Sequence, residues 1–175
     1  MTRDGTLSPG RVLEGGILAG LAFAIFEVVA AIVLTGPAHA FVPLRMIAAM
    51  VLGPHAMDPG YSLAAAASVG LLLHLILSMI FAAIFAALIP GTFATRSEIE
   101  LGMFYGLMLW LANFHLIGPA LGWVWFAQQP MPMPLAQLTA HTVAYGAVLG
   151  WFQHHAWVVD DAGVDEDLRE FHALN

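Results

Sequence analysis

The sequence predicts an all-α integral membrane protein whose four transmembrane helices form two tandem, related helical hairpins. Of the 175 residues, 60% are apolar and only 10% are charged, whereas soluble domains carry about 25% charged residues. No Asp, Glu, Lys or Arg occurs between Asp58 and Arg96 or between Glu100 and Asp160. Each of these runs exceeds the roughly 20 apolar residues that span a bilayer. A soluble enzyme is therefore excluded.

Charge and residue types exclude further classes of function. The formal net charge is −7 and the acidic residues gather at the C-terminal end, so no nucleic-acid partner is expected. The chain has no cysteine, which excludes disulfides, iron–sulfur clusters, thiolate zinc sites and covalent c-type haem. All five basic residues are arginines, which excludes Schiff-base chemistry on lysine.

Four apolar segments are expected to cross the membrane as helices, and they cover residues 12–34, 61–88, 101–117 and 135–157. A helix satisfies its own backbone hydrogen bonds where lipid offers none. A closed barrel would do so too, but its strands alternate polar and apolar residues and these segments do not. The first segment is longer than the apolar part of a signal peptide, about 7–15 residues. We therefore expect it to be retained.

The remaining segments complete the predicted organisation. It comprises a cytoplasmic N-terminus at 1–11, a first hairpin at 12–90, a second hairpin at 91–157 and an acidic cytoplasmic tail at 158–175. The first hairpin contains a long outer loop over residues 36–60 that carries four prolines. Within this loop, residues 44–52 are predicted to form a short helix on the outer surface, with Pro43 in its first turn.

The arginines predict the orientation in the membrane, because positive charges favour the cytoplasmic side. With both termini in the cytoplasm, only Arg45 lies outside, and the inside holds Arg3, Arg11, Arg96 and Arg169. The sequence therefore predicts that both termini are cytoplasmic.

The two halves of the chain resemble each other, which indicates a tandem duplication. Matching positions lie 86 residues apart between the first and third helices, namely Gly16–Gly102, Gly20–Gly106 and Glu27–Asn113. Between the second and fourth helices they lie 67 residues apart, namely His74–His141, Ser78–Tyr145 and Phe85–Phe152. The alternative is chance matching in a chain rich in Ala, Gly and Leu. A true duplication would relate the hairpins by an axis along the membrane normal.

Pairs of glycines four residues apart mark three of the predicted helices. They are Gly16 with Gly20, Gly102 with Gly106 and Gly146 with Gly150. Such GxxxG pairs let helix backbones approach closely in lipid. We expect them to pack inside the bundle, while any pair that points outward would suit a partner protein.

One polar residue from each helix is expected at a similar depth in the membrane. At 1.5 Å per residue, these positions lie about 18–24 Å from the cytoplasmic helix ends, and they are Glu27, His74, Asn113 and His141. One turn after the histidines, on the same helix faces, come Ser78 and Tyr145. Burying an ionised Glu27 would cost about 2.5–3.5 kcal/mol on insertion scales. We therefore expect its carboxyl group to be protonated or paired with a histidine.

This polar layer has three interpretations. The one we favour is a hydrogen-bond network that fixes helix register, with about 0.6 kcal/mol for each bond. In the second, His74 and His141 bind haem b, or bind a transition metal together with Glu27. In the third, Glu27 titrates against a histidine in a proton or ion path, which would need an oligomer because four helices make a thin conduit. Bound lipid is expected, and in the first interpretation no other cofactor.

The later helices resemble a known kind of protein. The patterns Gly-x-x-Tyr-Gly at 102–106 and His-x-x-x-Tyr-Gly-x-x-x-Gly at 141–150 are similar to those of small four-helix membrane proteins of bacteria and archaea, of the YagU-like kind. The resemblance implies a place in the bacterial or archaeal cytoplasmic membrane. It implies no activity or ligand.

We expect a small non-catalytic accessory or assembly subunit of a larger membrane complex, with a respiratory or electron-transfer assembly as the first candidate. Its partners would be membrane lipids and other membrane subunits. The alternatives are a haem- or metal-binding electron carrier that uses His74 and His141, and a proton- or ion-coupled transporter that acts as an oligomer. No Ser-His-Asp or His-Glu-x-x-His spacing indicates an enzyme.

Overall fold

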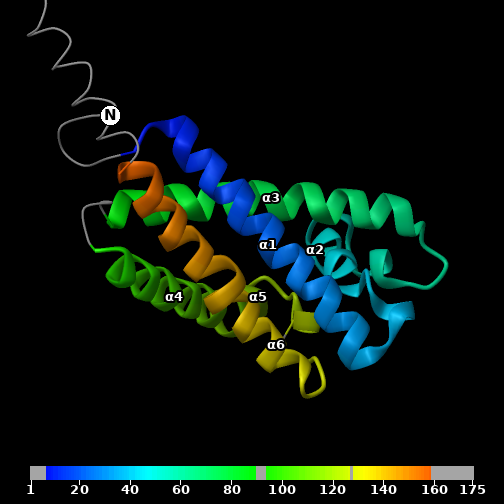
Figure 1. Cartoon of the computed structure of the whole chain (residues 1–175). Coiled ribbons are helices and arrows are strands. Elements are labelled where there is room, and N and C mark those ends of the chain that lie inside the picture. The colour runs from blue at the N-terminus through cyan, green and yellow to red at the C-terminus, as the bar shows by residue number, and fades with distance from the viewer. Residues whose placement is uncertain (1–6, 90–93, 127, 159–175) are drawn as a thin grey trace, which may run out of the picture.

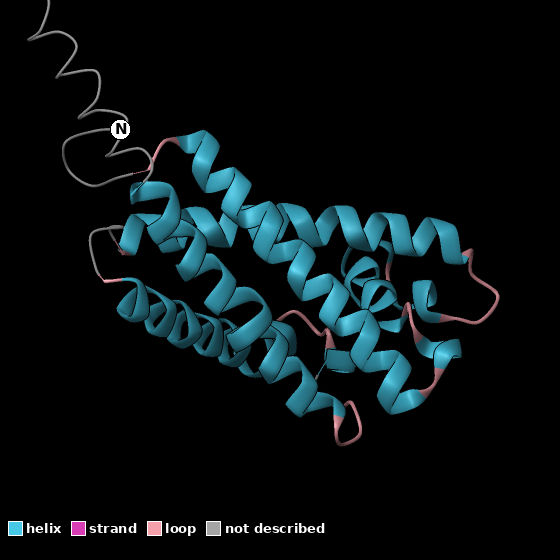
Figure 2. Cartoon of the chain, viewed as in Figure 1, coloured by secondary structure: helices cyan, strands magenta, loops and turns pink. Residues whose placement is uncertain are grey.

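The computed structural model describes residues 7–89, 94–126 and 128–158, and within them the chain is helices joined by loops, without strands (Figure 2). Three helices are long and apolar enough to cross a membrane, and they cover Pro9–Thr35, Leu63–Leu88 and Thr95–Ala120. The fold is all-α, as predicted, and these helices indicate a membrane protein. Most of the predicted N-terminal segment and nearly all of the acidic tail, 159–175, lie outside the described residues.

Helix α1 (Pro9–Thr35) begins three residues before the predicted segment because local residues favour an earlier start. The Ser8 hydroxyl accepts a hydrogen bond from the Arg11 backbone N–H at 3.4 Å, and Pro9 occupies the first turn. The helix ends at Gly36, whose φ of 97° is costly for any residue with a Cβ atom.

Helix α3 (Leu63–Leu88) packs along α1 (Figure 1). A Cβ atom on Gly16 would lie 2.8 Å from the Met79 Cα atom, and one on Gly20 would lie 2.7 Å from the Ser78 hydroxyl oxygen. Both distances are far below normal contact, so these two glycines let the helices approach closely.

Helix α2 (Val42–Leu52) lies in the long connection between α1 and α3 (Figure 1). It begins two residues before the predicted 44–52 helix, with Pro43 in its first turn. It packs against α3, where the Leu44 carbonyl meets Gly70. The short 3-10 helices η1 (Pro37–His39) and η2 (Pro54–Met57) flank it.

Arg45 holds this connection together. Its guanidinium donates hydrogen bonds to the backbone carbonyls of Ala56, Asp58 and Tyr61. Carbonyls accept but do not donate, and the planar guanidinium offers several donors at once. Arg45, which is predicted to lie outside, thus ties α2 to the residues just before α3.

The third apolar segment is helical over a longer range than predicted. Helix α4 (Thr95–Leu111) begins six residues before residue 101 and runs into the π-helical segment η3 (Ala112–Ile117) and the short α5 (Gly118–Ala120). Near its start, the exposed side chains of Arg96 and Glu100 form an i,i+4 ion pair with an N–O distance of 2.8 Å.

The fourth apolar segment belongs to a continuous helical stretch over residues 133–158. The stretch follows the short 3-10 helix η4 (Val124–Phe126) and comprises α6 (Met133–Thr139), the π-helical segment η5 (Ala140–Ala147) and residues 148–158. It lies beside α4 (Figure 1). The sequence did not predict the π-helical geometry here or in η3.

Candidate functional site

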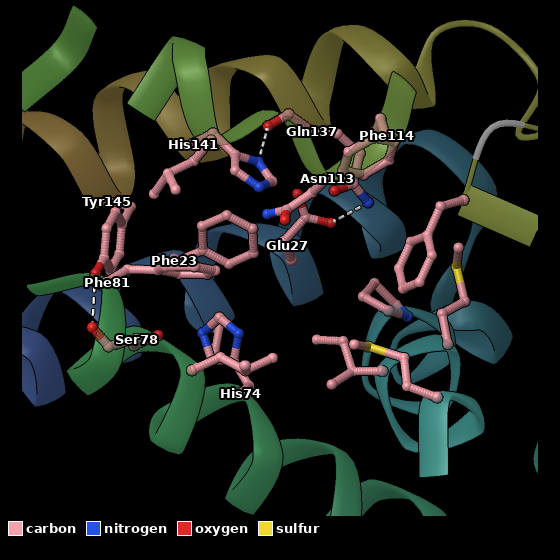
Figure 3. Close-up of a pocket in the computed structure, with 18 of the residues that line it drawn as sticks. Phe23, Glu27, His74, Ser78, Phe81, Asn113, Phe114, Gln137, His141 and Tyr145 are labelled. Carbon is pink, nitrogen blue, oxygen red and sulfur yellow. Dashed lines mark hydrogen bonds between the residues drawn. The ribbon is translucent and has the colours of Figure 1, made fainter. Parts of the chain in front are cut away.

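A cavity of about 350 Å³ lies among α1, α2, α3, η3 and the last helical stretch (Figure 3). The six residues of the predicted polar layer all line it, and they are Glu27, His74, Ser78, Asn113, His141 and Tyr145. The structure therefore brings residues from four predicted helices to one site. His115, which helix geometry places away from this layer, is exposed and contacts Trp110 instead.

Glu27 is the most unusual side chain at this site. It is only 2% exposed, and its Oε2 atom accepts a hydrogen bond from Gln137 Nε2 at 2.9 Å (Figure 3). Its Oε1 atom is buried without a hydrogen-bond partner among the described residues. The partner of the carboxyl group is thus an amide and not a histidine. Buried polar atoms without a hydrogen-bond partner are rare in folded proteins, so a role in binding can explain this one.

Backbone carbonyls fix both histidines. His74 Nε2 lies 2.8 Å from the Gly20 carbonyl, and His141 Nδ1 lies 2.8 Å from the Gln137 carbonyl. A carbonyl only accepts, so each of these ring nitrogens carries the hydrogen. In a neutral ring the other nitrogen is then an acceptor. The two histidines thus add acceptors to the cavity wall.

The hydroxyl residues make contacts that fix helix positions. The Tyr145 hydroxyl donates to the Ser78 backbone carbonyl at 2.7 Å (Figure 3). Tyr105 donates in the same way to the Phe81 carbonyl at 2.9 Å. These bonds tie α3 to α4 and to η5.

Phe23 lies between the two imidazole rings (Figure 3). Its ring centroid is 5.0 Å from that of His74 and 4.8 Å from that of His141. A haem iron bound by both histidines would need the space that this ring fills, so the residues as arranged do not fit that group. Among the described residues, no cluster of three His, Cys, Asp or Glu side chains could hold a metal ion. Ligation by His74, His141 and Glu27 remains a prediction.

The two π-helical segments supply half of the polar layer. Asn113 lies in η3, and His141 and Tyr145 lie in η5. Such π turns are rare and often occur at functional sites. The sequence gives no signal for them, because apolar residues around a π turn look like those of any membrane helix.

Sequence reasoning also missed Gln137, the partner of Glu27. A signal was present, because Gln137 precedes His141 by four residues and so lies on the same helix face. The apolar wall of the cavity was missed as well. It includes Met46 and Met50 from α2 and several aromatic rings, namely Phe81, Phe114, Trp123 and Phe126.

All three glycine pairs pack within the chain. Gly102 lies against Gly146, Gly106 against the His141 carbonyl, and Gly150 against the Glu98 carbonyl. Gly16 and Gly20 lie against α3, as described above. The pairs therefore serve helix packing inside the bundle, and their close approach sets the position of η5.

Comparisons of the chain with family models, with curated proteins and with solved structures found no match. The resemblance to YagU-like proteins therefore stays a prediction, and the site has to be interpreted from its own chemistry.

Proposed function

We propose that the protein is a four-span membrane protein that binds a small, largely apolar molecule with a hydrogen-bonding end in the cavity beside Glu27. This proposal rests on the Oε1 atom of Glu27, which has no hydrogen-bond partner among the described residues and lies at the wall of a mainly apolar cavity. Ligand pockets have this character, with volumes of about 300–1,000 Å³, apolar walls and a few polar groups that orient the ligand. A ligand that reaches Oε1 would satisfy the buried atom.

The fourth span is supported by the helical stretch over residues 133–158, which runs beside α4 (Figure 1). The duplication is supported by contacts that recur in both halves. Gly16 packs against Met79 in the first half, and at the matching positions in the second half Gly102 packs against Gly146. The proposed topology is two hairpins in the cytoplasmic membrane with both termini inside, and the arginine distribution supports this orientation.

A cavity-filling variant tests this function. The probe is 2-(2-naphthyl)ethanol, a neutral fluorescent alcohol, added to the protein in lipid nanodiscs with empty nanodiscs as the background. We expect saturable binding to the wild type. Leu77→Trp should abolish it, because Leu77 lines the cavity. Leu72→Trp, on the same helix but 62% exposed, should leave it unchanged. Absence of saturable binding to the wild type, or equal binding by both variants, would reject the function.

The role as an accessory or assembly subunit stays a prediction. Outward-facing glycine pairs would have favoured it, but all three pairs pack within the chain. Residues 159–175 of the acidic tail, which could dock on a partner, lie outside the described residues. Co-purification after mild extraction tests this role independently of ligand binding.

A further inference from the structure

We propose that the cavity selects protonated amines over neutral alcohols of the same shape, and that a bound ammonium group replaces the proton of the Glu27 carboxyl group. This inference rests on the proposed function and names its ligand class. It starts from the geometry at Glu27, where one carboxyl oxygen is held by Gln137 and the other meets the cavity without a partner.

No lysine or arginine is among the described residues that line the cavity. An ionised carboxylate in a medium of low dielectric constant needs a counter-charge, and without one it takes up a proton. Without a bound cation the carboxyl group therefore holds a proton on Oε1, because Oε2 accepts the Gln137 hydrogen bond. A ligand cation can take the place of that proton.

The other titratable and amide side chains that line the cavity come from four elements. From α3 comes His74, from η5 come His141 and Tyr145, from η3 comes the neutral Asn113, and from α6 comes the neutral Gln137. On α2 the only charged side chain is Arg45, which is bound to loop carbonyls. Glu27 is thus the only carboxyl group among the described lining residues.

The cavity wall offers hydrogen-bond acceptors and aromatic rings to an ammonium group. It carries donors only, and the wall offers acceptors at Glu27 and on the second nitrogen of each neutral histidine. Aromatic rings attract cations through their faces, and five line the cavity besides Tyr145, namely Phe23, Phe81, Phe114, Trp123 and Phe126. A neutral alcohol uses one acceptor and gains nothing from the carboxylate charge. The amine should therefore bind more tightly.

Binding of the amine exchanges one cation for one proton. A cation of the form RNH₃⁺ enters from solution, the Glu27 Oε1–H bond breaks, and the proton passes to the solvent. The ammonium N–H then donates to Oε1. One proton is released for each amine bound. Because the bound state holds one proton fewer, the apparent affinity for the amine rises about tenfold for each pH unit while this exchange operates.

The test compares 2-(2-naphthyl)ethylamine with 2-(2-naphthyl)ethanol on the full chain in nanodiscs. We expect the amine to bind at least about tenfold more tightly than the alcohol. Calorimetric titration in buffers of different ionisation enthalpy should give one proton released for the amine and none for the alcohol. Glu27→Gln should lose the proton release and should weaken amine binding at least about tenfold more than alcohol binding, because a glutamine amide can bond a hydroxyl but carries no charge. A thermal unfolding transition like that of the wild type shows that the variant is folded.

Other outcomes separate the two proposals. If Glu27→Gln keeps the amine preference, or if proton release is lost in His74→Gln or His141→Gln rather than in Glu27→Gln, the cation-exchange inference is wrong. The proposed function would still stand, because alcohol binding and its loss in Leu77→Trp do not depend on charge. If neither probe binds the wild type, both proposals fail.

Discussion

At the residue scale, the position of the Glu27 carboxyl group depends on Gln137. The two side chains come from helices far apart in sequence and meet in a buried hydrogen bond of 2.9 Å. In lipid such bonds are worth about 0.6 kcal/mol on average and up to about 1.7 kcal/mol. The bond therefore contributes modestly to stability but decides which carboxyl oxygen faces the cavity.

Gln137→Leu should lower the free energy of unfolding by about 0.6–1.7 kcal/mol, because the carboxyl group loses its donor. Unfolding by sodium dodecyl sulfate from mixed micelles measures this. The same substitution in a Glu27→Leu background should cost less, since the partner is already gone. Equal costs in both backgrounds would show that the two side chains are not coupled.

At the element scale, close glycine contacts set how helices pack. Gly106 lies against the carbonyl of His141, a residue that lines the cavity, and this contact holds η5 against α4. Backbone atoms cannot move aside as a side chain can, so any added methyl group there must push the two helices apart.

Gly106→Ala should therefore destabilise the protein by about 1–3 kcal/mol. The matched control is Gly10→Ala in α1, where an added Cβ meets nothing within 4 Å. Alanine is a better helix former than glycine by about 1 kcal/mol, so this control should be neutral or stabilising. Thermal unfolding of both variants in detergent measures the difference. Similar losses in the two would contradict the packing argument.

Much of the fold at this scale follows from the sequence. Three of the four predicted apolar segments lie within longer helical stretches, and Ser8 caps the early start of α1, whereas α3 begins at residue 63 and not at 61. The polar layer follows from helix rise alone. The π-helical segments do not, because they depend on contacts between helices. The packing of α2 over the cavity likewise depends on tertiary contacts rather than on local sequence.

At the scale of the whole molecule, the number of spans and the orientation decide which face of the membrane each loop meets. The accessibility of exposed residues near the helix ends therefore reports the topology. Asp58 follows α2, Thr95 begins α4 and Gln128 precedes α6, and all three are exposed. In the proposed topology, Asp58 and Gln128 lie outside and Thr95 lies inside.

The chain has no cysteine, so single-cysteine variants report one position each. In intact cells, a membrane-impermeant maleimide should label Asp58→Cys and Gln128→Cys, whereas Thr95→Cys should react only after permeabilisation. The cysteine-free parent gives the background. The reverse pattern at all three positions would invert the orientation. Labelling of Asp58→Cys and Gln128→Cys from opposite faces would exclude four spans.

The π-helical segments have a consequence for chain length. A π turn accommodates one residue more than the α-helix around it, so the parts of the last helical stretch before and after η5 are out of phase by one position. A related chain that lacked this turn could be one residue shorter without losing any contact at either end. Alignments of homologues should therefore tolerate a single-residue gap within 112–117 or 140–147 and not elsewhere in the helices. Where that gap occurs, the cavity should have lost the polar residues that the segment supplies, which are Asn113 for η3 and His141 and Tyr145 for η5.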